Sequence, residues 1–126
     1  MIVIIGGQYQ GRHAFAKSLM TEEYCLVDDA HEQVIAALLT QYGEELWELA
    51  EQELLRLIRE RLDTLMKDLR QAVIILPECG SGVISIDRQE TVKRRIIGCT
   101  GAYLASEAES CYRVFCGLGY RLDDNK

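Results

Sequence analysis

The sequence predicts an α/β domain with a small, mostly parallel sheet between layers of helices. Short apolar runs rich in β-branched residues occur at Met1–Ile5 and Gln71–Leu76, which is typical of strands buried on both faces. Segments with apolar residues at helical spacing lie between such runs. Strands that alternate with helices pair in parallel through right-handed crossovers, so we expect a three-layer arrangement.

Length and composition limit the class of protein. The 126 residues suffice for one domain, residues 1–126, and 48% hydrophobic with 27% charged residues is ordinary for a globular chain. A net charge of −6 argues against broad binding of nucleic acids or acidic membranes. Apolar runs are too short to span a membrane, and Met1 leads straight into strand residues rather than into a basic leader. We expect a cytoplasmic protein that binds neither nucleic acid nor membrane.

The cysteines predict no structural role for disulfides or zinc. There are five, an odd number, and no two are spaced as a Cys-x-x-Cys pair. We therefore expect buried free thiols. They are Cys25, Cys79, Cys99, Cys111 and Cys116.

A glycine loop follows the first strand. Gly6 and Gly7 open it, and Gly11 closes it where a helix over residues 11–20 begins. Strand, glycine loop and helix in this order direct backbone N–H groups at a phosphate, and the Gly-x-x-x-x-Gly spacing is that of a P-loop. The candidate nucleotide contacts are Gly6, Gly7, Gln8, Tyr9, Gln10, Gly11, Arg12 and His13.

The last two P-loop positions are altered. Arg12 replaces the lysine; it keeps the positive charge but is larger and planar. His13 replaces the hydroxyl residue that holds Mg²⁺ and suits other metals better. We expect the loop to accept an anion, and the alterations leave activation of a γ-phosphate open. A plain glycine turn, with His13 as a solvated or packing residue, explains the same pattern.

An acidic pair follows the second apolar run, Tyr24–Asp28. A carboxylate at the end of a buried strand beside a glycine loop is where P-loop proteins hold Mg²⁺, which points to Asp28. The structural alternative is that Asp28 or Asp29 caps the next helix, predicted over residues 30–42.

The clearest helical pattern runs from Glu44 to Arg70 after a break at Gly43. Its apolar stripe is wide, so we expect it to pack on a sheet or on a partner subunit. The last predicted strand is Cys111–Cys116, which gives a sheet of four strands. It is followed by Gly117-Leu-Gly119 and then by a polar tail that we expect to be frayed.

A second candidate functional loop follows Pro77, which ends the Gln71–Leu76 strand. It carries Glu78 and two glycines at the edge where ligands bind in open α/β sheets. Asp87 is placed to cap a helix over residues 88–107. That helix carries a basic cluster including Arg94, which could contact either water or a phosphate.

Two stretches resemble one family, the adenosylcobinamide kinase/adenosylcobinamide-phosphate guanylyltransferases of cobalamin biosynthesis. Residues 6–13 are similar to its Gly-Gly-x-x-Ser-Gly-Lys-Ser loop. Residues 77–85 are similar to its Asn-Glu-Val-Gly-x-Gly-Ile-Val-Pro stretch, with Glu78, Gly80 and Gly82 on shared positions. Arg94 matches an arginine of the family's arginine-rich helix.

The resemblance implies a P-loop NTPase-like fold, a transferase that uses GTP or ATP with Mg²⁺, and an oligomer. The acceptor would be a corrinoid, a cobinamide-like alcohol. It places Arg12 and Glu78 in catalysis and Asp28 at the metal. The substrate side would be formed by Gly80, Gly82 and Arg94.

The chain also departs from this family. The family attaches GMP to a histidine between its P-loop helix and its Mg²⁺-binding strand, where this chain has only a few residues and no histidine. Guanylyltransferase activity is therefore not expected. Two functions stay open: a kinase for a cobinamide-like alcohol, and a nucleotide- or phosphate-binding or interaction module without turnover.

Overall fold

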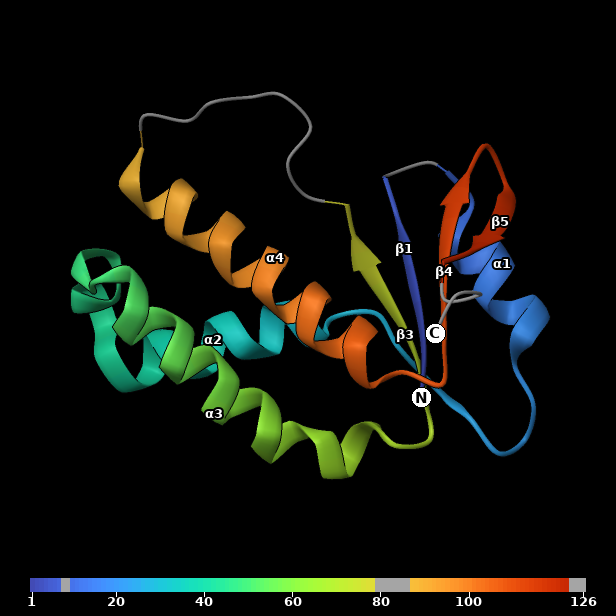
Figure 1. The fold of residues 1–126 in the computed structure, drawn as a ribbon, viewed down its shortest axis with the longest axis horizontal. Helices are drawn as coiled ribbons and strands as arrows, with labels where there is room; N and C mark the ends of the chain where they lie inside the picture. The colour runs from blue at the N-terminus through green and yellow to red at the C-terminus, as the bar shows by residue number, and fades with distance from the viewer. Residues whose placement is uncertain (8–9, 79–86, 123–126) are drawn as a thin grey trace.

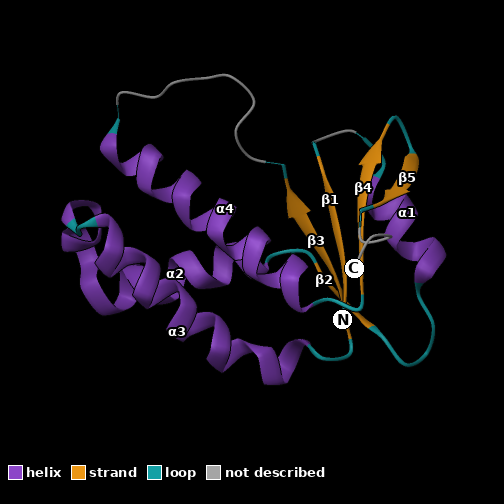
Figure 2. Ribbon diagram, viewed as in Figure 1, coloured by secondary structure: helices purple, strands orange, loops and turns teal. Residues whose placement is uncertain are grey.

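The computed structural model, which describes residues 1–7, 10–78 and 87–122, contains one sheet of five strands with helices on both faces (Figure 1). The strand order is β2-β3-β1-β4-β5, and only β5 runs antiparallel to its neighbour (Figure 2). This confirms the predicted α/β class and the mostly parallel sheet. The strands are β1 (Ile2–Gly6), β2 (Cys25–Val27), β3 (Ala72–Pro77), β4 (Ser110–Phe115) and β5 (Leu118–Arg121).

The central strand is β1. It pairs with β3 on one side and with β4 on the other, from Ile2 to Gly6. Val3 and Ile4 are fully buried and point to opposite faces, into two separate apolar clusters. A strand buried on both faces needs an unbroken apolar run, which explains why β1 could be predicted from its composition.

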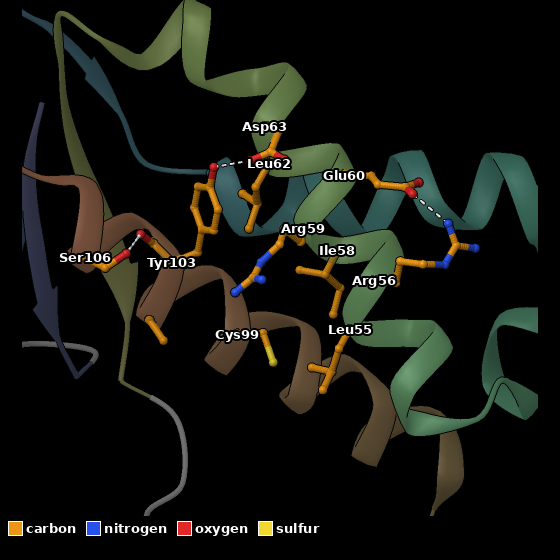
Figure 3. Close-up of a pocket in the computed structure, with 11 residues that line it drawn as sticks. Leu55, Arg56, Ile58, Arg59, Glu60, Leu62, Asp63, Cys99, Tyr103 and Ser106 are labelled. Atoms are coloured by element: carbon orange, nitrogen blue, oxygen red, sulfur yellow. Dashed lines mark hydrogen bonds and ion pairs between the residues drawn. The ribbon is translucent and has the colours of Figure 1, made fainter.

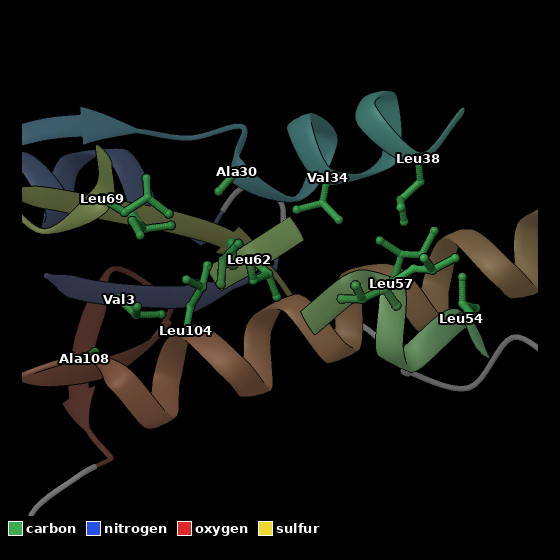
Figure 4. Close-up of a cluster of buried hydrophobic side chains, with 14 of the residues drawn as sticks. Val3, Ala30, Val34, Leu38, Leu54, Leu57, Leu62, Leu69, Leu104 and Ala108 are labelled. Carbon is green, nitrogen blue, oxygen red and sulfur yellow. The ribbon is translucent and has the colours of Figure 1, made fainter. Parts of the chain in front are cut away.

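The helices form two unequal layers. One face carries α1 (Arg12–Leu19), whose Ala16 is buried against the sheet. The other face carries α2 (Ala30–Tyr42), α3 (Glu51–Leu69) and α4 (Arg88–Glu107). Leucines and valines from these three helices meet β1 and β3 in the larger cluster, which Figure 4 shows in close-up.

The continuous helix predicted over residues 44–70 is wrong. A short 3₁₀ helix, η1 (Gly43–Glu48), comes first, and α3 starts only after Leu49 and Ala50. These two residues have extended backbones, with ψ of 141° and 148°. The wide apolar stripe of α3 lies in the core, where it packs on α2 and α4 rather than on a partner subunit.

A contact with α4 accounts for the break. In a continuous helix, the carbonyl of Trp47 would accept a hydrogen bond from the amide four residues later. Here Arg88 Nε donates to that carbonyl instead, and Lys93 Nζ lies 5.8 Å from the centroid of the Trp47 ring. No glycine or proline lies at this break, so neighbouring residues carry no signal for it.

The sheet has a fifth strand where four were predicted. Cys116 and Gly117 form a two-residue turn with φ of 50° and 77°, and β5 returns beside β4. Turns with two positive φ values suit the twist of hairpins, and glycine favours them. The start of the tail that was expected to fray, Tyr120 and Arg121, is therefore paired with β4.

The start of α4 is confirmed. Asp87 occupies the N-cap position, and its side chain accepts a hydrogen bond from Gln89 N at 3.0 Å. The expectation of buried thiols is wrong for Cys25 and Cys116, which are exposed. Cys79 lies outside the described residues.

On the side of the sheet covered by α1, the ring of Phe15 packs closely against Gly119. A Cβ atom placed there would overlap the ring of Phe15, which packs edge-on against Tyr112 with centroids 5.2 Å apart. We predict that Gly119→Ala lowers the free energy of unfolding by about 1–3 kcal/mol, because a ring held on both sides cannot move away. Urea unfolding followed by circular dichroism measures this.

Gly98→Ala is the matched control. A Cβ atom at Gly98, inside α4, meets no heavy atom within 4 Å. The same substitution there should stabilise the protein by about 0.5–1 kcal/mol through helix propensity. Equal effects at both positions would contradict the packing seen at Gly119.

Candidate functional site

The strongest candidate site lies where β1 ends and α1 begins. Gly11 holds the N-cap position in the left-handed region, with φ 85° and ψ 24°, and no side chain of the described ranges caps the helix. Among the described residues, nothing accepts a hydrogen bond from the amides of Arg12, His13 and Ala14. The first turn contains no acidic residue. These amides and the helix dipole together make a partial positive charge that suits an anion.

Arg12 adds a full positive charge at this point. The aliphatic part of the Arg12 side chain lies against the end of β1: a Cβ atom on Gly6 would come 2.9 Å from Arg12 Cγ. Within the described part of the chain, no carboxylate forms an ion pair with Arg12. The guanidinium is therefore available to a ligand.

Gln10 anchors the loop to the β4–β5 turn. Its Oε1 accepts a hydrogen bond from Cys116 N at 2.6 Å, and its carbonyl accepts one from Gly117 N at 2.8 Å. Gly11 passes so near the turn that a Cβ atom on it would lie 3.1 Å from Gly117 Cα. The amide of Gln10 donates to Gly7 O at 3.4 Å, so this predicted phosphate donor is used inside the loop.

Asp28 faces the start of α1. Its Oδ2 lies 3.2 Å from His13 Nε2, within hydrogen-bond distance, and both side chains are about half-exposed. The helix-capping position belongs instead to Asp29, whose side chain accepts a hydrogen bond from Gln33 Nε2 at 2.9 Å. The position of Asp28 thus agrees with a role beside the loop rather than with capping of α2.

Glu78 also lies at this edge of the sheet. Its amide donates to Gly6 O at 3.2 Å, directly beside the loop. Its carboxylate forms an ion pair with Arg113 Nη2 at 2.6 Å. Because β1 lies between β3 and β4, this ion pair passes over the end of the central strand. The negative charge of Glu78 is thereby offset by a residue that the sequence reasoning missed.

His31 is a second residue that the sequence reasoning missed. Its side chain is only 12% exposed, and Nδ1 is buried without a hydrogen-bond partner among the described residues. Burial lowers the pKa of His31 below its usual 6.5, and Arg12 acts in the same direction, whereas Glu32, Asp29 and Asp28 oppose the shift. His31 is therefore a neutral imidazole at neutral pH, close to Arg12 and Asp28.

The structure does not bring Arg94 to this site. Arg94 belongs to the first turns of α4, which lie away from the carboxyl ends of β1 and β3 in Figure 1, and its Nε is 3.8 Å from Glu90 Oε1. Arg94 therefore lies apart from the residues gathered at this edge, and its substrate-side role stays a prediction. Four other predicted site residues, Gln8, Tyr9, Gly80 and Gly82, lie outside the described residues.

A separate hollow lies between α3 and α4 (Figure 3). Its volume is about 640 Å³, and its floor is apolar. Two arginines and two acids line it, Arg56, Arg59, Glu60 and Asp63, so its charges balance. Arg56 pairs with Glu60 at 2.6 Å, and the Tyr103 hydroxyl donates a hydrogen bond to Asp63. Burial raises the pKa of the Cys99 thiol, which keeps it protonated.

Comparison with known proteins assigns no function to this site. Neither the models of protein families nor the curated proteins give a significant match to the chain. No helix in the described ranges is both long and apolar enough to cross a membrane. Within residues 1–7, 10–78 and 87–122, no three histidine, cysteine or acidic side chains gather as a metal site.

We predict that His31 contributes to the pH dependence of stability. Because its pKa is lowered in the folded state, the unfolded chain binds more protons as the pH falls through 6.5, and folding weakens. When the pH falls from above 6.5 to below it, the His31→Gln variant should therefore lose less unfolding free energy than the wild type. Urea titration at each pH measures this. His13→Gln controls for the loss of a histidine, and an unchanged slope in His31→Gln would contradict the prediction.

Proposed function

We propose that this protein binds a nucleoside triphosphate, GTP or ATP, with its phosphates at the start of α1. One observation carries the proposal: helix amides and an Arg12 guanidinium that have no partner among the described residues lie at the end of the central strand. A phosphate there would receive backbone hydrogen bonds, the charge of the helix end and a bidentate contact from arginine. The resemblance of residues 6–13 to a P-loop supports the same ligand.

Asp28 is the residue that would hold Mg²⁺. Proteins commonly bind this ion through one or two carboxylates while the substrate phosphates and water supply the other oxygens. A single half-exposed carboxylate beside the loop fits that requirement. His13, which now pairs with Asp28, would be left to contact a phosphate oxygen.

Glu78 supports a second candidate, phosphoryl transfer to a cobinamide-like alcohol. It adjoins the loop, and its carboxylate pairs with Arg113 over the end of the central strand. However, stabilising the transferred phosphoryl group is the main task of such enzymes, and the usual lysine and hydroxyl are replaced by Arg12 and His13. We therefore place binding without rapid turnover first and the kinase second.

Removal of the Arg12 charge should weaken nucleotide binding. We predict that Arg12→Ala raises the Kd for GTP or ATP by about ten- to a hundredfold, the effect of losing a charged hydrogen bond. Calorimetric titration with and without Mg²⁺ measures this. Lys17→Ala, at the other end of the same helix, is the control and should leave Kd nearly unchanged. Equal losses in both variants would point to a general charge effect, and no binding by the wild type would end the proposal.

The two candidates differ in the fate of the γ-phosphate. We expect bound GTP or ATP to keep it when the protein is incubated with Mg²⁺ and cobinamide, as followed with a labelled γ-phosphate. Transfer of label to cobinamide, lost in both Asp28→Asn and Glu78→Gln, would establish the kinase instead. Binding measured in parallel on the same samples separates a failed reaction from a failed site.

A further inference from the structure

Three large apolar side chains lie exposed together on the β4–β5 hairpin. They are Phe115, Leu118 and Tyr120, and we call them the hairpin patch. Between 52% and 61% of each residue is exposed. Single exposed apolar side chains are normal on protein surfaces, whereas adjacent ones are typical of a binding surface.

Strand pairing puts the patch on one face of the sheet. Phe115 pairs with Leu118. Tyr120 pairs with Arg113, which lies two residues before Phe115 in β4. Paired residues of antiparallel strands point to the same side, and so do residues two apart in one strand. The opposite face of the hairpin, at Gly119, is covered by α1.

Within the described residues, no helix covers the patch. Cys111, on the same face at the start of β4, belongs to the large core cluster under α2, α3 and α4. Farther along β4 and on β5, the side chains on that face are exposed. The ring of Phe115 is therefore accessible to a ligand.

Phe115 borders the glycine loop. Val114 pairs with Gly6, the last residue of β1, so Phe115 lies one residue beyond the end of the central strand. The next residue, Cys116, donates its amide to Gln10 Oε1 at 2.6 Å. Figure 1 shows the hairpin turn beside the start of α1. Neighbouring strands are about 4.8 Å apart, and the ribose and base of a nucleotide extend farther than this.

The size of the patch favours a small ligand over a protein partner. Each half-exposed side chain presents about 100 Å², so the patch presents about 300 Å², whereas each partner of a stable protein complex contributes about 800 Å². A nucleobase needs only one aromatic face on which to stack.

The distribution of charge also matches a nucleotide. The phosphates are anionic, and the proposed phosphate site consists of helix amides and the guanidinium of Arg12. The base is uncharged at neutral pH. The patch has no charged side chain, and the nearby Arg113 is offset by Glu78 at 2.6 Å. A charged and an uncharged surface thus adjoin in the same order as the two ends of the ligand.

We propose that the base of the bound nucleoside triphosphate stacks on the ring of Phe115. This inference rests on the proposed function, because the phosphates must lie at the start of α1 for the base to reach the hairpin. The phenylalanine ring has no hydrogen-bonding group, so this contact depends on the ring of the base rather than on its polar edge. It therefore serves guanine and adenine alike.

The test compares nucleotides with a ligand that carries the same ribose and phosphates but no base. Calorimetric titration at one Mg²⁺ concentration gives the Kd of ATP, GTP and ribose 5-triphosphate. The wild type should bind each nucleotide about five- to a hundredfold more tightly than ribose 5-triphosphate, the range expected for stacking of one base. In NMR spectra, the base protons of bound ATP should shift upfield, as protons above an aromatic ring do.

Three variants locate the contact. Phe115→Thr removes the ring but keeps a high strand propensity, so it should bind ATP no more tightly than ribose 5-triphosphate, with the Kd of the latter unchanged. Phe115→Tyr keeps the ring and should keep the advantage of ATP. Leu122→Thr, the control, removes another exposed apolar side chain after β5 and should also keep it.

The outcomes separate this inference from the proposed function. Binding of ribose 5-triphosphate with no advantage for ATP or GTP would overturn the stacking and leave the phosphate site in place. An advantage that persists in Phe115→Thr, or that is lost equally in Leu122→Thr, would also overturn it. A wild type that binds none of the three ligands would end the proposed function itself. If Phe115→Thr fails to fold, the upfield shift in the wild type, present or absent, decides the question.

Discussion

The arrangement of the whole molecule depends on β1 being hydrogen-bonded on both sides along its length. Because β1 lies between β3 and β4, three connections leave the sheet at the same edge: the glycine loop, the segment that starts at Glu78 and the hairpin turn. This brings together residues that are far apart in the sequence, such as Gln10 and Cys116. The site is thus a property of strand order, and a different order would scatter its parts.

Charge at this edge is distributed unequally. The two carboxylates nearest the loop already have partners, Asp28 with His13 and Glu78 with Arg113, whereas Arg12 has no ion pair in the described part of the chain. His31 is held neutral by burial and adds no competing charge. Arg12 thus remains available to an anion at this edge of the sheet, in a protein whose net charge is −6.

The sequence could predict what local patterns determine. The apolar runs of β1 and β3 and the cap at Asp87 are local signals, and the structure has all three. The break before α3 depends on Arg88 reaching Trp47, and the pair of Glu78 with Arg113 depends on strand order, so neither has a signal in neighbouring residues. β5 was different: a two-residue turn containing glycine between alternating apolar residues is a known hairpin signal, which the interpretation as a frayed tail overlooked.

The two hydrogen bonds of Gln10 have a consequence beyond holding the loop in place. They join the glycine loop to the turn of the hairpin that carries Phe115 and Tyr120, so the two segments must gain or lose order together. An event that rigidifies one of them reduces the entropy that the other still has to lose.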